Sequence, residues 1–184
     1  MRTMKKIVIL FSGKGSNFAH LAKTLQGDIE IALAITNNPN AGGIEVAKTH
    51  DIPLEIIESS LFPTREAFDE ALVKAIQKTG ADLVVLAGFM RILTPVFTDN
   101  VKAINLHPSL LPRHKGVEAI RRSFEDEHPE GGVSVHWVSS ELDAGEIIIQ
   151  KTILKAGLDL ESYDHAVRRL EKEALSDAIR VVLS

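Results

Sequence analysis

Cysteine is absent from this sequence of 184 residues. Its absence excludes disulfide bonds, thiolate zinc sites and a cysteine nucleophile, and it fits a reducing compartment. An apolar stretch long enough to cross a membrane is also lacking. The five apolar residues before Ser12 are too few for a signal peptide. We therefore expect a cytoplasmic protein with no membrane partner.

A strong charge of either sign is lacking too. The net charge is −4, which gives no electrostatic reason to expect a nucleic-acid partner. Apolar residues make up 45% of the chain and charged residues 25%, as in ordinary soluble globular proteins. Neither a linker nor an internal repeat interrupts the chain. The length therefore predicts one domain over residues 1–184 with a real hydrophobic core.

Short apolar runs alternate with segments of helical periodicity along the chain. Residues 7–11 form an unbroken apolar run, which is typical of a strand buried on both faces. Strands alternating with helices predict an α/β fold, with a Rossmann-like, mostly parallel twisted sheet and helices on both faces. The predicted strands cover residues 7–11, 29–35, 54–57, 83–87, 102–106, 131–138 and 145–153.

The helices are marked by their end signals. Pro63 and Thr64 open the clearest one, and Gly80 closes it. A long C-terminal helix is expected over residues 161–183, and shorter ones near residues 16–25, 44–49 and 117–127. Only a short turn separates the last two strands, so we expect an antiparallel strand near the C-terminal end of the sheet.

The segment SGKGSN follows the first predicted strand and opens a helix. Glycines let the backbone approach a ligand closely, and free N–H groups at a helix start point towards an anion. The pattern is neither G-x-G-x-x-G nor a Walker motif, which favours a single phosphate over a dinucleotide or triphosphate. A plain strand-to-helix turn capped by Ser16 or Asn17 is the alternative.

Asn105 and His107 lie two positions apart where the fifth predicted strand meets a proline-rich loop. Strand alternation places both side chains on one face. Pro108 then favours extended geometry at His107 and helps to end the strand. The carboxyl ends of parallel strands are the usual place for chemistry in α/β proteins. A capping asparagine beside a buried, satisfied histidine would give the same pattern.

Three further charged residues are candidates for the same region. Asp143 lies in a loop before a strand, and a loop folding back over the strand ends would bring it to His107. There a carboxylate would orient the imidazole ring and favour its protonated form. Arg91, in an otherwise apolar loop, could bind a carboxylate, and Arg65 opens a helix. An aspartate in such a loop more commonly just turns the chain, and an arginine at a helix start is more commonly a surface charge. For Arg91 a solvated surface position explains the pattern equally well. Apart from His107 and His136, the histidines occupy expected surface or helix positions without metal-ligand spacing, so we expect no metal: His20, His50, His114, His128 and His165.

Several motifs occur together in order: FSGKGSN, TREAF, VVLAGFMRIL, INLHPSLLP, GVSVHWV and ELDAG. Together they resemble the phosphoribosylglycinamide formyltransferase family of folate-dependent enzymes, over nearly the whole chain. The resemblance implies transfer of a formyl group from 10-formyltetrahydrofolate, as cosubstrate, to the amine of 5′-phosphoribosylglycinamide in de novo purine biosynthesis. Both partners are small molecules, and the resemblance also allows a homodimer.

The resemblance also implies roles for individual residues. Asn105, His107 and Asp143 would be catalytic. The ribonucleotide phosphate would be held by Gly15, Ser16 and Asn17, and its ribose by Glu173. The folate would lie against the loop of residues 141–145 and the following residues: Arg65, Met90, Arg91, Ile92, Leu93 and Asn105.

The sequence departs from the family pattern in three places. His114 replaces a common aromatic residue, Ala144 replaces a common glycine, and the C-terminal helix keeps only the glutamate of a Glu-His pair. Two other readings stay open. A formyltetrahydrofolate hydrolase shares the catalytic trio, although hydrolases and methionyl-tRNA formyltransferases normally carry an additional domain. A non-catalytic phosphate-binding domain would require the trio to be accidental.

Overall fold

A computed structural model of the chain describes residues 3–184. The residues cluster into two compact units: one runs to Ile104 and also takes in Leu183, and the other covers Asn105–Val182 and Ser184. Hydrogen bonds connect the strands in the order β3-β2-β1-β4-β5-β6-β7. The predicted α/β class, mostly parallel with an antiparallel strand towards the C-terminal end, is confirmed.

The first unit is built on parallel strands. Strand β1 (Lys5–Phe11) pairs with β2 (Ile29–Thr36) and β4 (Leu83–Leu86), and β2 also pairs with β3 (Leu54–Ile56). Residues Ile7–Phe11 are fully buried, as expected for a strand covered on both faces. Parallel strands place their carboxyl ends at one edge, so the loops after β1 and β4 leave this edge together.

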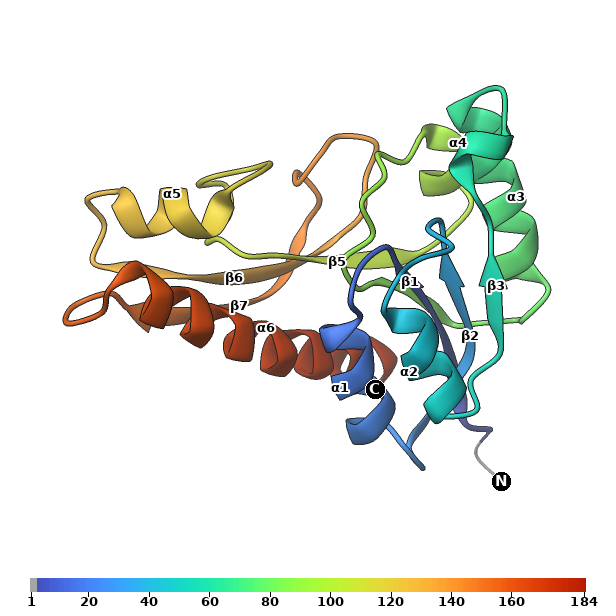
Figure 1. Cartoon of the computed structure of the whole chain (residues 1–184), viewed down its shortest axis with the longest axis horizontal. Helices are drawn as coiled ribbons and strands as arrows, with labels where there is room; N and C mark the ends of the chain where they lie inside the picture. Colours follow the sequence, from blue (N-terminus) through green and yellow to red (C-terminus); the bar gives the residue numbers. More distant parts are fainter. Residues whose placement is uncertain (1–2) are drawn as a thin grey trace. The chain divides into compact units, whose positions relative to one another are not determined.

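The helices of the first unit follow the sequence signals closely. Thr64 caps α3 (Arg65–Gln77) by accepting a hydrogen bond from the Ala67 N–H at 3.1 Å. Helices α1 (Ser16–Thr24) and α2 (Gly43–Thr49) also match their predictions (Figure 1). Two short elements were not predicted, namely α4 (Pro95–Thr98) and a 3₁₀ turn, η1 (Ser59–Leu61).

The second unit consists of an antiparallel hairpin and two helices. Strands β6 (Glu130–Trp137) and β7 (Ile147–Leu154) pair over their length. Helix α6 (Leu160–Leu183) runs beside them in Figure 1, and α5 (Ala119–Glu125) precedes β6. The rings of Phe124 and Tyr163 lie 5.5 Å apart and pack α5 and α6 into this core.

Strand β5 (Ala103–His107) crosses from the first unit into the second. Its first two residues belong to the first unit, where the Val84 N–H donates to the Lys102 carbonyl at 3.0 Å. Its last three residues, Asn105–His107, open the second unit. The predicted strand was one residue too early at both ends. The shift leaves Asn105 and His107 inside the strand, so their common face is kept.

Candidate active site

His107 ends β5 with its ring held between two acceptors. The side chain is 6% exposed. Its Nε2 lies 2.8 Å from the backbone carbonyl of His114, and its Nδ1 lies 3.5 Å from Oδ2 of Asp143. A carbonyl oxygen only accepts hydrogen bonds, so Nε2 carries a proton. An ionised carboxylate also only accepts, so the ring serves both partners when both nitrogens are protonated.

Asp143 comes from the loop between β6 and β7 and is 7% exposed. Its backbone adopts a left-handed conformation, with φ 52°, which turns the carboxyl group inward. The Gly116 N–H donates to Oδ2 at 2.9 Å. The predicted approach of this loop to His107 is therefore present in the structure. Its catalytic role stays a prediction.

The electrostatic balance around Asp143 favours the carboxylate. Burial raises the pKa of its carboxyl group. The His136 ring, the Gly116 N–H and the charges of His107 and His136 together lower that pKa by more than burial raises it, so the net shift is downward. The carboxylate therefore stays ionised at neutral pH in a largely dry environment, where it interacts strongly with the neighbouring imidazoles.

His136 is a second histidine at this carboxylate, and the sequence analysis gave it no role. It lies on β6, and its Nε2 is 3.7 Å from Oδ1 of Asp143. Its Nδ1 lies 3.0 Å from the Trp137 carbonyl and donates to it, which fixes the ring orientation. The alternation of Val133, Ser134, Val135 and His136 in the sequence places Ser134 and His136 on one face of the strand but gives neither residue a role.

Gly145 allows the loop that carries Asp143 to return close to β6. A Cβ atom at this position would lie 1.6 Å from the Trp137 carbonyl oxygen, the same oxygen that accepts from His136. Only glycine fits this approach. The residue therefore helps to place Asp143 and His136 together.

Asn105 shares the face of β5 with His107, as alternation predicts. It is half-buried, so its amide is within reach of a ligand. An amide and an imidazole that leave one strand end on one face provide two hydrogen-bond donors for a single oxygen atom.

The loop after β1 begins α1 in an unexpected way. The N-cap is Gly15, with φ 79° and no side-chain cap, so the alternative of a turn capped by Ser16 or Asn17 is not what the structure shows. A Cβ at Gly15 would lie 2.7 Å from the Gly43 Cα, so the close approach to α2 requires glycine. The backbone at the start of α1 thus faces outward, with Ser16 exposed and Asn17 half-buried.

The segment after β4 carries the residues predicted to contact folate. Met90 and Ile92 are 76% and 55% exposed, whereas Leu93 lies in the core. The Arg91 guanidinium lies 5.5 Å from the Phe68 ring centroid. Arg65 is exposed at the start of α3. Two large exposed apolar side chains beside an arginine fit a ligand with an aromatic body and a carboxylate tail.

Asp69 holds the end of this segment. Its Oδ2 accepts from the Thr94 N–H at 2.6 Å and from the Thr94 hydroxyl at 2.7 Å, and the group is buried. At the start of the segment, the Met90 N–H donates to the Ser12 hydroxyl at 2.8 Å. The segment is therefore fixed at both ends while its middle projects.

Glu173 lies on α6 with an exposed side chain. It contributes to a negative potential at Lys151 that helps to raise the pKa of that lysine, behind the larger effect of the Asp177 hydrogen bond. The neighbouring Glu171 is buried and lies 3.6 Å from Arg168. The role of Glu173 at a ribose stays a prediction.

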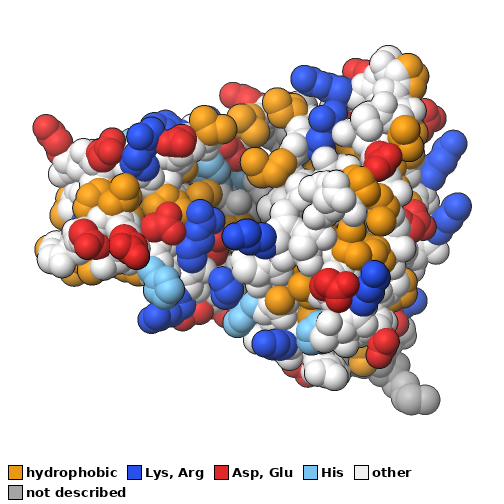
Figure 2. Space-filling model, viewed as in Figure 1, with side chains coloured by type: hydrophobic (Ala, Val, Ile, Leu, Met, Phe, Trp, Pro, Cys, Tyr) orange, Lys and Arg blue, Asp and Glu red, His pale blue; other side chains and the backbone are white. Residues whose placement is uncertain are grey.

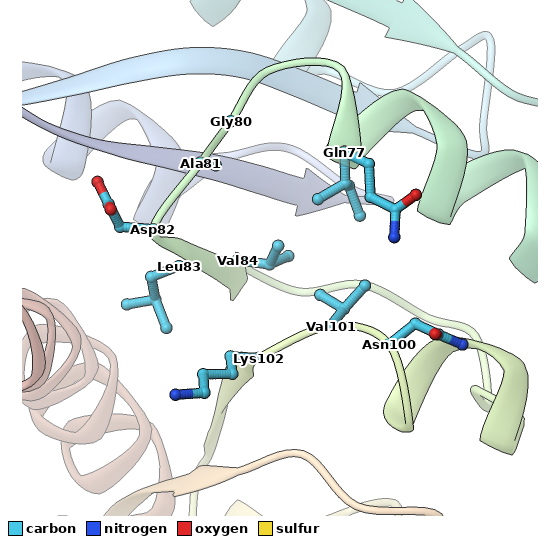
Figure 3. A pocket seen from close by; sticks show the side chains of 10 residues that line it. Gln77, Gly80, Ala81, Asp82, Leu83, Val84, Asn100, Val101 and Lys102 are labelled. Atoms are coloured by element: carbon cyan, nitrogen blue, oxygen red, sulfur yellow. The ribbon is translucent and has the colours of Figure 1, made fainter.

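A hollow of about 330 Å³ lies elsewhere in the first unit, at the amino ends of β4 and β5. Figure 3 shows Asp82, Asn100 and Lys102 around it. It contains none of the predicted site residues. Ligands of parallel sheets bind at the carboxyl ends of the strands, so we do not assign a substrate to this hollow.

Two further features bear on cofactors and membranes. Within residues 3–184, histidine and acidic side chains form no group of three or more that could hold a metal ion. Over the same range, every helix is too short or too polar to span a membrane.

Comparison with known proteins identifies relatives over nearly the full chain. The formyl transferase family matches residues 5–179. A phosphoribosylglycinamide formyltransferase from Escherichia coli is 39% identical over 152 residues, which cover 80% of this chain and 72% of that protein. The crystal structure of a phosphoribosylglycinamide formyltransferase from Campylobacter jejuni is 46% identical, with a TM-score of 0.96 over 100% of both chains.

Longer relatives also match. A trifunctional purine biosynthetic protein from Chironomus tentans is 36% identical over 188 residues, which cover 98% of this chain. The chain spans only 14% of the length of that protein.

Proposed function

This chain belongs to the formyl transferase family, and from that premise we propose that it transfers a formyl group from 10-formyltetrahydrofolate to the amine of 5′-phosphoribosylglycinamide. The reaction is a step of de novo purine biosynthesis. The relatives from Escherichia coli and Campylobacter jejuni carry the name of this enzyme and match most or all of this chain. The observation that carries the proposal is the contact of His107 with Asp143 at the end of β5, beside Asn105.

The proposed mechanism is direct attack of the substrate amine on the formyl carbon. A carbon–nitrogen bond forms, and the formyl oxygen becomes an oxyanion in a tetrahedral intermediate. The Asn105 amide and the Nδ1–H of His107 donate hydrogen bonds to that oxyanion, since Nε2 is engaged by the His114 carbonyl and the 3.5 Å contact of Nδ1 with Asp143 is long enough for the N–H to turn towards a closer acceptor. One such donor typically contributes about 3–4 kcal/mol to transition-state stabilisation.

Collapse of the intermediate breaks the bond between the formyl carbon and N10 of the folate. The attacking amine must lose a proton and N10 must gain one, so the products are tetrahydrofolate and the formylated ribonucleotide. The Asp143 carboxylate lies beside the Nδ1 of His107 and can pass this proton directly or through a water molecule. No covalent acyl-enzyme is needed.

The residues proposed to bind the substrates are those that the family resemblance implies. The backbone at Gly15–Asn17 would bind the phosphate, and Arg65 with the 90–93 segment would bind the folate. Glu173 would bind the ribose. A cytoplasmic location and a homodimer also remain predictions.

An assay of the purified protein tests this function. We expect 10-formyltetrahydrofolate to yield tetrahydrofolate only when 5′-phosphoribosylglycinamide is present, with one formylated ribonucleotide per turnover by mass spectrometry. Equal turnover without the ribonucleotide would identify a hydrolase. No turnover under either condition would leave the phosphate-binding domain as the better interpretation.

A further inference from the structure

One short segment of the second unit, Arg113–Gly116, contacts both catalytic side chains. The His114 carbonyl accepts from Nε2 of His107 at 2.8 Å, and the Gly116 N–H donates to Asp143 at 2.9 Å. We call these four residues the bracket. Because it contacts one atom of each side chain, its position sets the geometry of the His107–Asp143 pair.

The bracket has a backbone that does not form by itself. His114 has φ 55°, in the left-handed region that few residues other than glycine adopt, with asparagine, aspartate and histidine the commonest exceptions. Such a conformation is sparsely populated and persists only where surrounding contacts maintain it. Surrounding contacts must therefore hold it in place: the Ser109 hydroxyl donates to the Arg113 carbonyl at 2.6 Å, and the side chains of Arg113 and His114 reach outward to Asp126.

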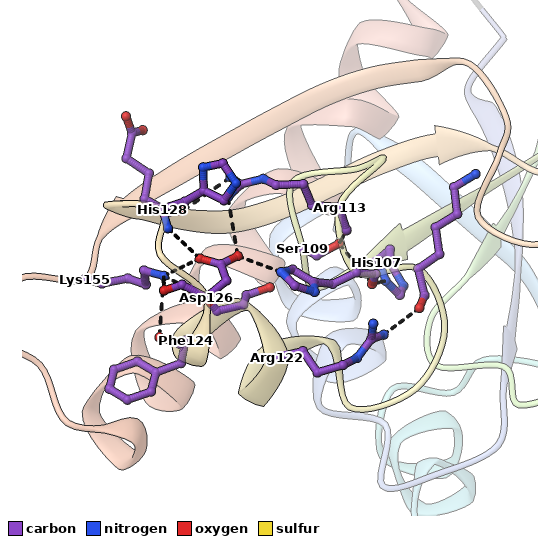
Figure 4. A network of polar contacts seen from close by, with 12 residues as sticks. His107, Ser109, Arg113, Arg122, Phe124, Asp126, His128 and Lys155 are labelled. Atoms are coloured by element: carbon purple, nitrogen blue, oxygen red, sulfur yellow. Dashed lines mark hydrogen bonds and ion pairs between the residues drawn. The ribbon is translucent and has the colours of Figure 1, made fainter.

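Asp126, just after α5, supplies these contacts. Its Oδ2 lies 2.6 Å from Nε2 of His114 and 3.5 Å from Nη1 of Arg113. Its Oδ1 lies 2.7 Å from Nζ of Lys155 and accepts from the His128 N–H at 2.9 Å (Figure 4). Both carboxylate oxygens are therefore committed, and one of them holds the bracket.

The charge state of Asp126 is secured by the same contacts. Burial raises the pKa of its carboxyl group, but the hydrogen bonds from Lys155 and His114 lower it by more, so its pKa lies well below the usual value. The side chains of Asp126 and Lys155 are 16% and 10% exposed, so solvent screens this pair weakly.

Lys155 connects Asp126 to the rest of the unit. Its Nζ donates to the Ser123 carbonyl at 2.7 Å and to the Asp126 carbonyl at 3.1 Å, at the carboxyl end of α5. A second anchor is Arg122 of α5, which donates to the Lys115 carbonyl at 2.5 Å. The bracket is thus fixed to α5 at two points, and Asp126 controls the point next to His107.

We propose that Asp126 is a positioning residue, which holds the bracket through His114 and Arg113 so that the His114 carbonyl and the Gly116 N–H orient His107 and Asp143 for formyl transfer. The inference rests on the proposed function for its kinetic consequence only. The sequence alone predicted a surface or helix position for His114. In the structure its side chain is 20% exposed and pairs with Asp126.

Two variants separate this role from a general contribution to stability. Asp126→Asn removes the charge that holds His114 and Arg113. His114→Asn removes the reach to Asp126 but retains a residue that accepts the left-handed backbone, so the bracket can still form. Asp164→Asn is the matched control, because it breaks an exposed ion pair with Arg168 at 3.4 Å on α6, away from the bracket.

Kinetics with both substrates form the first arm of the test. We expect both variants to lower kcat by about tenfold to a hundredfold, since small displacements of catalytic groups have effects of this size. The KM for the ribonucleotide should change by less than about twofold, because the bracket contacts none of the residues assigned to the ribonucleotide. The control should match the wild type.

NMR of the histidine side chains forms the second arm and requires no activity. The wild-type ¹⁵N spectrum should show a protonated Nε2 on His107, and both variants should shift the two His107 nitrogen signals. If the wild-type protein does not transfer the formyl group, the proposed function is contradicted. The NMR measurement still tests the positioning role in that case. Unchanged His107 signals, unchanged kcat, or a loss confined to KM would overturn the positioning role. If the Asp126→Asn variant does not fold, the kinetics and NMR spectra of the His114→Asn variant alone decide whether the positioning role holds.

Discussion

At the scale of single residues, the pairing of His107 with Asp143 makes the most direct prediction. Asp143→Asn should lower kcat by on the order of 100-fold, since it removes the charge that faces Nδ1 and the proton acceptor beside it. The KM for the ribonucleotide should change little, because its phosphate is assigned to another loop. Steady-state kinetics with both substrates check this.

A double-mutant cycle shows whether the two residues act together. His107→Ala combined with Asp143→Asn should be hardly slower than His107→Ala alone, as for groups that act as a unit. Fully additive losses would mean that Asp143 shapes its loop without serving His107.

His136 makes a second prediction at this scale. His136→Phe keeps the ring volume but removes the nitrogen that lies 3.7 Å from Asp143. Loss of one polar contact should lower kcat by about tenfold, which corresponds to roughly 1.4 kcal/mol. The contact lowers the pKa of Asp143, so its removal should raise that pKa and move the acid limb of the kcat profile to higher pH. An unmoved limb would contradict the assignment.

The sequence predicted part of this site. Alternation placed Asn105 and His107 on one face because the two positions are neighbours along a single strand. The role of His136 was missed because Asp143, seven positions later in the chain, returns to it through an irregular loop. Hydrophobic periodicity does not describe such a loop. The His114 carbonyl was missed for another reason: a backbone contact leaves no mark on residue type.

At the scale of elements, the predictions worked best where the local signal was strong. Strand β1 is a continuous apolar run, and α3 has a threonine cap and a regular apolar stripe. Helix α4 was missed because its four residues are too few for periodicity. It forms where buried Asp69 accepts from the Thr94 N–H, a contact between residues 25 positions apart.

The start of α1 provides a prediction at this scale. Asn17→Asp should raise the KM for the ribonucleotide by about tenfold or more, because it places a negative charge beside the expected phosphate at the amino end of a helix. The KM for 10-formyltetrahydrofolate should change much less. Gly27, in the loop after the same helix, offers a control: Gly27→Asn adds no charge, meets no atom within 4 Å at its Cβ, and uses the residue type that best tolerates the left-handed φ of 88° there. Equal effects of Asn17→Asp on both KM values would point to a different phosphate site.

At the scale of the whole molecule, the amino-acid composition predicted an ordinary globular protein. The alternation of strands and helices along the chain predicted the mostly parallel sheet. Acidic and basic side chains are interspersed over the face seen in Figure 2, in keeping with a small net charge. The division into two compact units was not predicted, because it depends on contacts across the chain that hydrophobic periodicity does not report. The single domain over residues 1–184 stays a prediction.

Two carboxyl groups of the second unit that are shielded from solvent contribute to the dependence of stability on pH. The pKa values of Asp126 and Asp143 both lie below the usual 3.8 in the folded protein. A lowered pKa means that the unfolded chain takes up protons first as the pH falls. The stabilisation is therefore fully present above about pH 4 and is lost as the pH falls through the folded-state values.

Urea unfolding between pH 7 and pH 2 measures this loss. The free energy of unfolding of the wild type should fall below about pH 4, by up to about 1.4 kcal/mol per pH unit for each group that titrates. Asp126→Asn should be less stable at pH 7 and should lose less on acidification, because one of the two titrating groups is gone. Asp164→Asn should reproduce the wild-type slope. A slope unchanged by Asp126→Asn would mean that Lys155 and His114 keep their partner without its charge, and that the acid sensitivity arises elsewhere in the chain.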